Sequence, residues 1–85
     1  MKKKATKRTI RHAEHTYTVI LEPEDVGGYS AYCPALPGCY SQGETLAEAT
    51  RNIQEAVDLY CETLLEDGKP LPEDKVVVRQ VVASV

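Results

Sequence analysis

The 85-residue sequence contains no tryptophan and no phenylalanine, so its five tyrosines must supply all of the aromatic packing. It has no apolar run that approaches the roughly 18 residues of a membrane span. The basic opening MKKK is not followed by the apolar segment of a signal peptide. Three cysteines are an odd number, and nothing else in the sequence indicates export. We therefore expect a cytoplasmic protein with free thiols and no membrane association.

Acidic residues are absent from the start of the chain, where six of the ten basic residues fall within the first eleven positions. These six are Lys2, Lys3, Lys4, Lys7, Arg8 and Arg11. Residues 12–85 carry a formal charge of −9. The split predicts a flexible basic arm, residues 1–15, ahead of one acidic domain, residues 16–85. The acidic body favours a basic partner, whereas the arm could bind nucleic acid weakly by neutralising phosphates.

Hydrophobic periodicity predicts an α+β domain in the order β-β-β-α-β. The segments TYTVIL (16–21), YSAYC (29–33) and GCYSQ (38–42) are typical of strands, with Tyr17, Val19 and Leu21 on one face. The apolar stripe of a long helix follows, formed by Leu46, Ala49, Ile53, Ala56, Val57, Tyr60 and Leu64. A fourth strand is expected over residues 75–85. The pattern therefore predicts one helix on one face of a small sheet.

The boundaries of the helix and the corner before it also follow from residue type. Thr45 and Glu48 form a capping box at the start of the helix, and Gly68 supplies its left-handed end. In the segment PALPG, Pro37-Gly38 suits a type II turn. Leu36 is available as a buried plug. Cys33 and Cys39 flank this corner without a C-x-x-C pair, so we expect packed thiols and no zinc.

The stretch from Gly27 to Tyr60 is similar to the N-terminal domain of the HicB antitoxin family. The resemblance covers about residues 16–72 and rests on Gly28-Tyr29, Pro34, Leu36-Pro37-Gly38-Cys39, Gly43, Thr45, Glu48-Ala49, Asn52 and Glu55-Ala56. It implies a partial RNase H-like fold. It also implies a partner, because HicB proteins block HicA, a small basic mRNA-cleaving toxin with a double-stranded-RNA-binding-like fold. Many members carry a C-terminal DNA-binding domain, and we expect none here because the chain ends at Val85.

An acidic row on the predicted helix supports a basic partner independently. Glu55, Asp58, Glu62 and Glu66 follow one another at spacings of three and four. Like charges at such spacings cost roughly 0.2–0.5 kcal/mol per pair. The row is therefore either a solubilising face or a docking strip for a basic partner.

The sequence does not place candidate catalytic residues in the arrangement that an enzyme requires. A two-metal nuclease needs converging carboxylates, but the candidates Glu22, Glu24 and Asp25 follow the first strand in a loop, with Glu48 or Glu55 on the helix. The pair His12 and His15 could be half of a metal site or simply solvated. Ser30 and Ser41 lack an activating motif. We expect no enzymatic activity and no cofactor or metal.

The second face of the sheet predicts self-association. Both faces of the expected last strand are apolar, with Val76, Val78 and Val82 on one face and Val81 on the other, and Tyr32 adds an apolar side chain in the second strand. An apolar edge strand invites aggregation unless it is covered, so we expect a homodimer or tetramer. The sequence is best interpreted as an antitoxin that covers the RNA-binding surface of a HicA-like toxin. The alternative is a stand-alone oligomeric adaptor or regulator with weak nucleic-acid binding through its arm.

Overall fold

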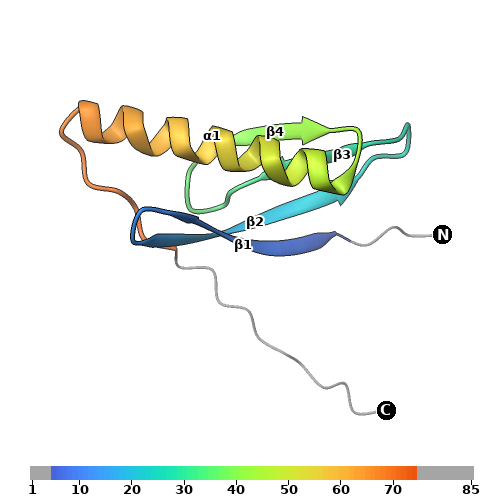
Figure 1. Ribbon diagram of the computed structural model, residues 1–85, viewed down its shortest axis with the longest axis horizontal. Coiled ribbons are helices and arrows are strands. Elements are labelled where there is room, and N and C mark those ends of the chain that lie inside the picture. The colour runs from blue at the N-terminus through green and yellow to red at the C-terminus, as the bar shows by residue number, and fades with distance from the viewer. Residues whose placement is uncertain (1–4, 75–85) are drawn as a thin grey trace, which may run out of the picture.

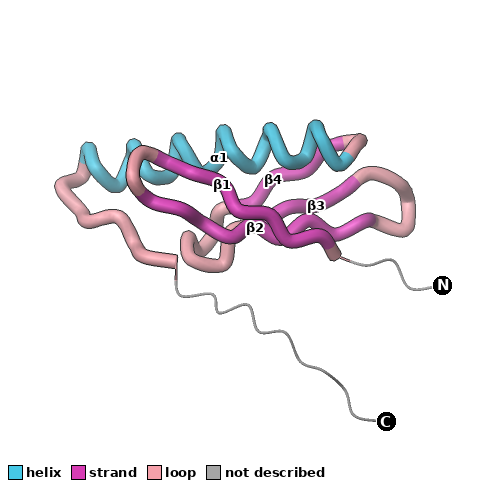
Figure 2. Tube along the Cα trace, turned by 60° about the horizontal axis from the view of Figure 1, so that its bottom comes forward, coloured by secondary structure: helices cyan, strands magenta, loops and turns pink. Residues whose placement is uncertain are grey.

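The computed structural model describes residues 5–74 as a four-stranded antiparallel sheet with one long helix (Figure 1). The strands are β1 (Thr6–His12), β2 (His15–Pro23), β3 (Tyr29–Tyr32) and β4 (Tyr40–Gly43), and they lie side by side in chain order. The helix α1 (Leu46–Glu66) lies along one face of this sheet (Figure 2). The predicted α+β class, with one helix on a small sheet, is confirmed.

Strand β1 contradicts the predicted flexible arm (residues 1–15) over the part that the structure describes, because residues Thr6–His12 form a strand. Residues Thr6–His12 pair along their whole length with β2, from Thr6 opposite Leu21 to His12 opposite His15. Ile10 is buried and lies opposite Tyr17, so both share the face that α1 covers. The sequence did not predict this strand because its basic residues mask the alternation of apolar and polar side chains. Charged side chains commonly protect an edge strand from pairing with another chain.

The order of elements differs from the prediction for the same reason. Four strands, not three, precede the helix. The strand expected after it, residues 75–85, lies outside the described residues, as do residues 1–4. The more specific description as a partial RNase H-like fold stays a prediction.

The core lies between α1 and the sheet face that it covers. Tyr17, Val19 and Leu21 of β2 are fully buried there, as the alternation predicted. From the helix, the fully buried residues are Ala49, Ile53, Val57 and Cys61. The other members of the predicted stripe are partly buried, and Cys61 is the core residue that the pattern left out.

The PALPG corner has the predicted turn. The backbone N–H of Cys39 donates to the carbonyl of Leu36 at 3.0 Å, and Gly38 at the third position has a φ of +84°. The Leu36 side chain is fully buried beneath the corner. A short distance on, Gly43 brings β4 against the start of the helix. A Cβ there would overlap the backbone of Ala49, so glycine is needed for close packing.

The predicted C-terminal cap of α1 is present, and at the N-terminus the Thr45 half of the predicted capping box is present. The Thr45 hydroxyl accepts from the Glu48 backbone N–H at 3.1 Å. At the other end, Gly68 has a φ of +71° and donates to the Leu65 carbonyl, while Lys69 donates to the Leu64 carbonyl. This pair of hydrogen bonds is a Schellman motif. Hydrogen bonds at both ends therefore hold the helix that carries the acidic residues.

Candidate partner-binding site

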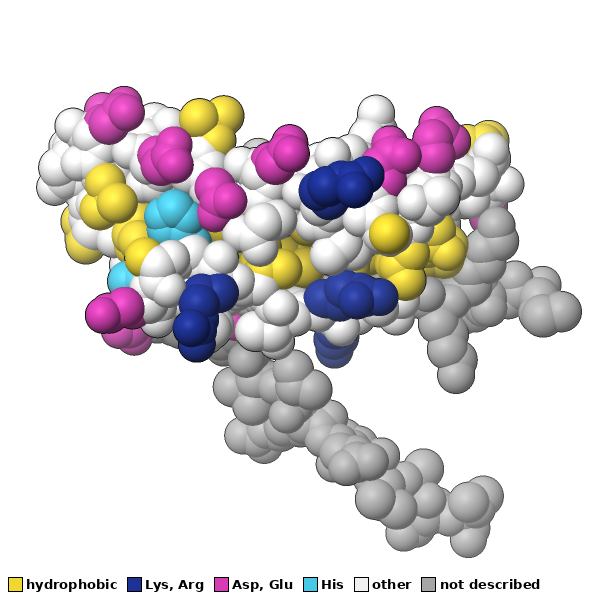
Figure 3. All heavy atoms as spheres, viewed as in Figure 1, with side chains coloured by type: hydrophobic (Ala, Val, Ile, Leu, Met, Phe, Trp, Pro, Cys, Tyr) yellow, Lys and Arg dark blue, Asp and Glu magenta, His cyan; other side chains and the backbone are white. Residues whose placement is uncertain are grey.

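The acidic row predicted from the sequence lies on α1, and acidic side chains are spread along the helix in the space-filling view (Figure 3). Glu55, Glu62 and Glu66 are exposed to solvent. They are separated by seven and four residues, so they share the side of the helix that points away from the sheet. No basic residue lies in the last turn of α1 to offset them. This surface is suited to a positively charged partner.

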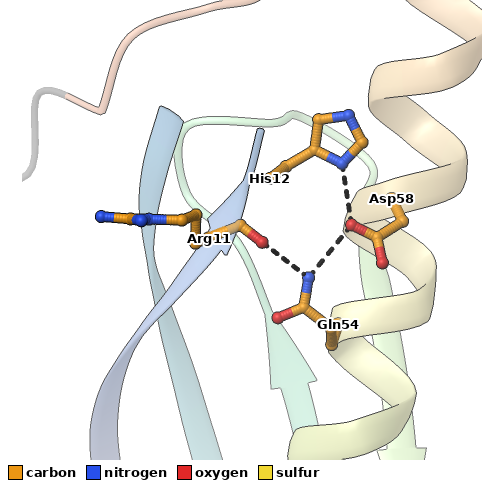
Figure 4. A network of polar contacts seen from close by, with 4 residues as sticks. All are labelled: Arg11, His12, Gln54 and Asp58. Carbon is orange, nitrogen blue, oxygen red and sulfur yellow. Dashed lines mark hydrogen bonds and ion pairs between the residues drawn. The ribbon is translucent and has the colours of Figure 1, made fainter. Parts of the chain in front are cut away.

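Asp58 differs from the three exposed glutamates because it is already engaged within the fold. Its Oδ1 lies 2.8 Å from the Nδ1 of His12 and accepts from the amide of Gln54 at 3.0 Å (Figure 4). The same Gln54 amide donates to the backbone carbonyl of Arg11 at 3.0 Å. The network ties β1 to α1, and it leaves Asp58 less available to a partner than the sequence suggested.

The two histidines predicted as a possible half of a metal site lie opposite each other in the β1–β2 hairpin, but their rings make different contacts. His12 turns to Asp58, whereas the ring of His15 stacks on Tyr17 at 6.2 Å. The Nδ1 of His15 is buried and has no hydrogen-bond partner among the described residues. Between residues 5 and 74, no group of three or more metal-ligating side chains is arranged to hold an ion.

Two of the carboxylates weighed for a nuclease, Glu24 after β2 and Glu48 on α1, line one hollow together with Glu44, but the described residues hold no group of three or more metal-ligating side chains arranged for an ion. Glu22, Glu24 and Asp25 are exposed at the end of β2 and in the loop that follows, and Glu55 points outward from the helix. Ser30 in β3 lies opposite Gln42, and Ser41 in β4 lies opposite Ala31.

The described basic residues no longer form one arm. Lys7, Arg8 and Arg11 lie in β1 and are exposed. Alternation along the strand places Arg8 on the face that carries α1, and Lys7 and Arg11 on the opposite face. Lys2, Lys3 and Lys4 lie outside the described residues.

The three thiols are packed in the interior. Cys33, Cys39 and Cys61 are free and buried. Burial raises the pKa of Cys33 to about 11, and it also raises the pKa values of Cys39 and Cys61. Because the thiolate is the reactive form, these cysteines behave as small apolar core residues.

An apolar groove between α1 and β4 was not predicted from the sequence. It has a volume of about 340 Å³, and its walls include Tyr40 at the sheet edge and Ala56, Leu59 and Tyr60 on the helix. Leu59 is 66% exposed, whereas Tyr40 borders the groove at the strand edge, because its side chain lies on the sheet face away from α1. In the sequence, the groove is indicated only by Leu59, an apolar residue that falls outside the apolar stripe and interrupts the acidic side of the helix.

The residues predicted for self-association are only partly described. Tyr32 lies in β3, opposite Tyr40 of β4, with ring centroids 6.3 Å apart on the sheet face that α1 does not cover. Val76, Val78, Val81 and Val82 lie outside the described residues.

Comparison with known proteins gives consistent matches. A family model described as HicB-like antitoxin of bacterial toxin–antitoxin systems matches residues 17–84. A UPF0150 protein of Synechocystis sp. is 49% identical over 65 residues, which is 76% of this chain and 82% of the relative. A UPF0150 protein of Thermoplasma acidophilum is 45% identical over 58 residues, covering 68% of this chain and 84% of the relative.

One solved structure, a HicA3 and HicB3 toxin–antitoxin complex, contains a chain with a similar fold. The TM-score is 0.56 at 34% sequence identity, and the match covers 66% of this chain. This chain spans only 64% of that neighbour's length. Within residues 5–74, the single helix is not apolar enough to cross a membrane.

Proposed function

The chain belongs to the HicB-like antitoxin family, and from this premise we propose that it is a non-enzymatic cytoplasmic antitoxin. It binds a small basic HicA-like toxin and stops the toxin from cleaving mRNA by covering its basic RNA-binding surface. The toxin is the partner rather than a substrate, so the antitoxin needs affinity and charge complementarity but no catalytic group.

The observation that carries this proposal is the exposed acidic side of α1. Glu55, Glu62 and Glu66 are fixed on a capped helix and face solvent. A row that served folding alone would include lysines at the alternate positions, because opposite charges three or four residues apart stabilise a helix. The likeness to a chain of a HicA3–HicB3 complex adds support from an independent comparison.

Co-expression with the neighbouring gene tests the proposal. The neighbouring gene should encode a small basic protein that arrests growth when expressed alone, and this chain should restore growth and co-purify with that protein. Restored growth without a complex, or a complex without restored growth, would contradict neutralisation by binding.

A charge-reversal variant identifies the surface. Substituting Glu55, Glu62 and Glu66 with lysine should weaken the complex by several kcal/mol if close charge pairs form, on the order of the coupling measured for such pairs elsewhere. A matched variant with lysine at Glu14, Asp25 and Glu73, all exposed and off the helix, changes the net charge equally. Equal weakening by both variants would show long-range attraction and no contact at the helix.

A further inference from the structure

One wall of the groove between α1 and β4 is the outer edge of the sheet. The carbonyl of Cys39 accepts from the N–H of Cys33 and therefore points toward β3. Backbone direction alternates along a strand, so the N–H and C=O of Tyr40 point away from the sheet. The described chain therefore presents one backbone donor and one acceptor beside the apolar floor of the groove.

The next outward carbonyl along this edge is already occupied. The side-chain amide of Asn52 on α1 donates to the carbonyl of Gln42 at 2.7 Å. A partner strand could thus pair at Tyr40 but could not extend a full ladder past Gln42. The edge admits a short backbone pairing and excludes the open-ended strand addition that leads to aggregation.

Charge indicates which partner fits the groove. On its outer side the groove meets the helix surface that carries Glu55, Glu62 and Glu66, with Leu59 beside them. Two copies of this chain joined at the β4 edges would bring two such acidic surfaces together. The other flank of the helix, toward β1, holds Arg8 and Arg51 around a separate hollow, which disfavours a cationic partner there. The groove therefore suits a basic protein.

We propose that the α1–β4 groove is the docking site for an extended segment of the basic partner. One apolar side chain of that segment enters the groove between Leu59 and Tyr60, and its backbone pairs with Tyr40. Lysine or arginine side chains on either side of it contact the exposed glutamates of α1. This proposal rests on the proposed antitoxin function and adds the surface and the mode of contact.

Calorimetric titration with the toxin identified by the co-purification experiment tests the groove. Leu59→Asp should raise the dissociation constant by about tenfold or more, because it places a carboxylate in the apolar floor. Leu65→Asp is the matched control. Leu65 is also exposed, at 55% against 66% for Leu59, and lies about 120° around the same helix. Its dissociation constant should stay within about twofold of the unsubstituted protein.

Amide hydrogen exchange supplies a second measurement that does not depend on a substitution. The Tyr40 amide should exchange readily in the free protein and become protected in the complex. If a complex forms but Leu59→Asp binds normally and the Tyr40 amide is unchanged, the groove is not the site, although the antitoxin function stands. If the unsubstituted protein forms no complex, both proposals fail. If Leu59→Asp instead converts a dimer of this chain to monomers in light scattering and leaves toxin affinity unchanged, the occupant is a second copy and the proposal is wrong.

Discussion

Replacing Glu62 with lysine should make the free protein more stable while it weakens the complex. Glu62 has Asp58 four residues before it and Glu66 four residues after it. Each like-charge pair costs about 0.2–0.5 kcal/mol, and each opposite pair returns a similar amount. A lysine also suits the negative end of the helix dipole better than a glutamate. Because Asp58 already interacts with His12, the net gain is placed at about 0.5–1.5 kcal/mol.

Thermal unfolding followed by circular dichroism measures this gain. In a domain of this size the gain corresponds to a rise in Tm of about 2–12 °C. The rise should shrink as salt is added, because exposed charges are screened. Glu62→Gln removes the repulsion without adding attraction and should give about half of the rise. An unchanged or lower Tm for Glu62→Lys would refute the argument that the acidic side of α1 is kept at a cost to stability.

Four further outcomes are expected. Gly43→Ala should lower Tm more than Gly38→Ala, because a Cβ at residue 43 overlaps the backbone of the helix. A Cβ at residue 38 meets open space, so only its positive φ disfavours alanine there, and equal losses of Tm would contradict the close-packing argument. Burial raises the pKa of Tyr17 from 10.0 to about 12, so the unfolded chain loses this proton first and the free energy of unfolding should fall between pH 10 and 12. The fall should be less steep in Tyr17→Phe, and identical slopes of the unfolding free energy against pH would refute this. Light scattering at micromolar concentration should report a dimer or tetramer that dissociates when charges replace Val78 and Val81, and a stable monomer would end the self-association hypothesis. Binding to duplex DNA should be weak and independent of sequence, with a log–log salt slope of up to about −5 for the six basic residues near the N-terminus, whereas a salt-insensitive, sequence-specific footprint would contradict it.

The parts of the fold that the sequence predicted are those set by local rules. The helix follows from an apolar stripe of period 3.6, and its ends follow from Thr45 and Gly68, which satisfy backbone groups within one turn. The PALPG corner follows from the fixed φ of Pro37 and the positive φ of Gly38. None of these features depends on a residue far away in the chain.

The missed features depend on distant partners. Strand β1 is held by pairing with β2 and by Ile10 packing under the helix, and its basic residues made it similar to a solvated terminus. The contact between His12 and Asp58 joins residues 46 positions apart. The groove at Leu59 exists only because β4 lies beside that part of α1. Sequence patterns specify which face of an element is apolar, but they do not specify which neighbour lies beside it.

The two flanks of α1 now explain why only one part of the acidic row is available to a partner. Toward β1, Gln54 and Asp58 turn inward to Arg11 and His12, so the carboxylate nearest the sheet stabilises the hairpin. Away from the sheet, Glu55 and Glu62 face solvent, and beside them the β4 flank is open and apolar at Leu59. A basic partner therefore gains least on the β1 flank, where Asp58 already contacts His12 and Gln54 and where Arg8 and Arg51 line a hollow with Gln54. It gains most where exposed glutamates border the groove, because charge attraction and apolar burial then act on the same contact.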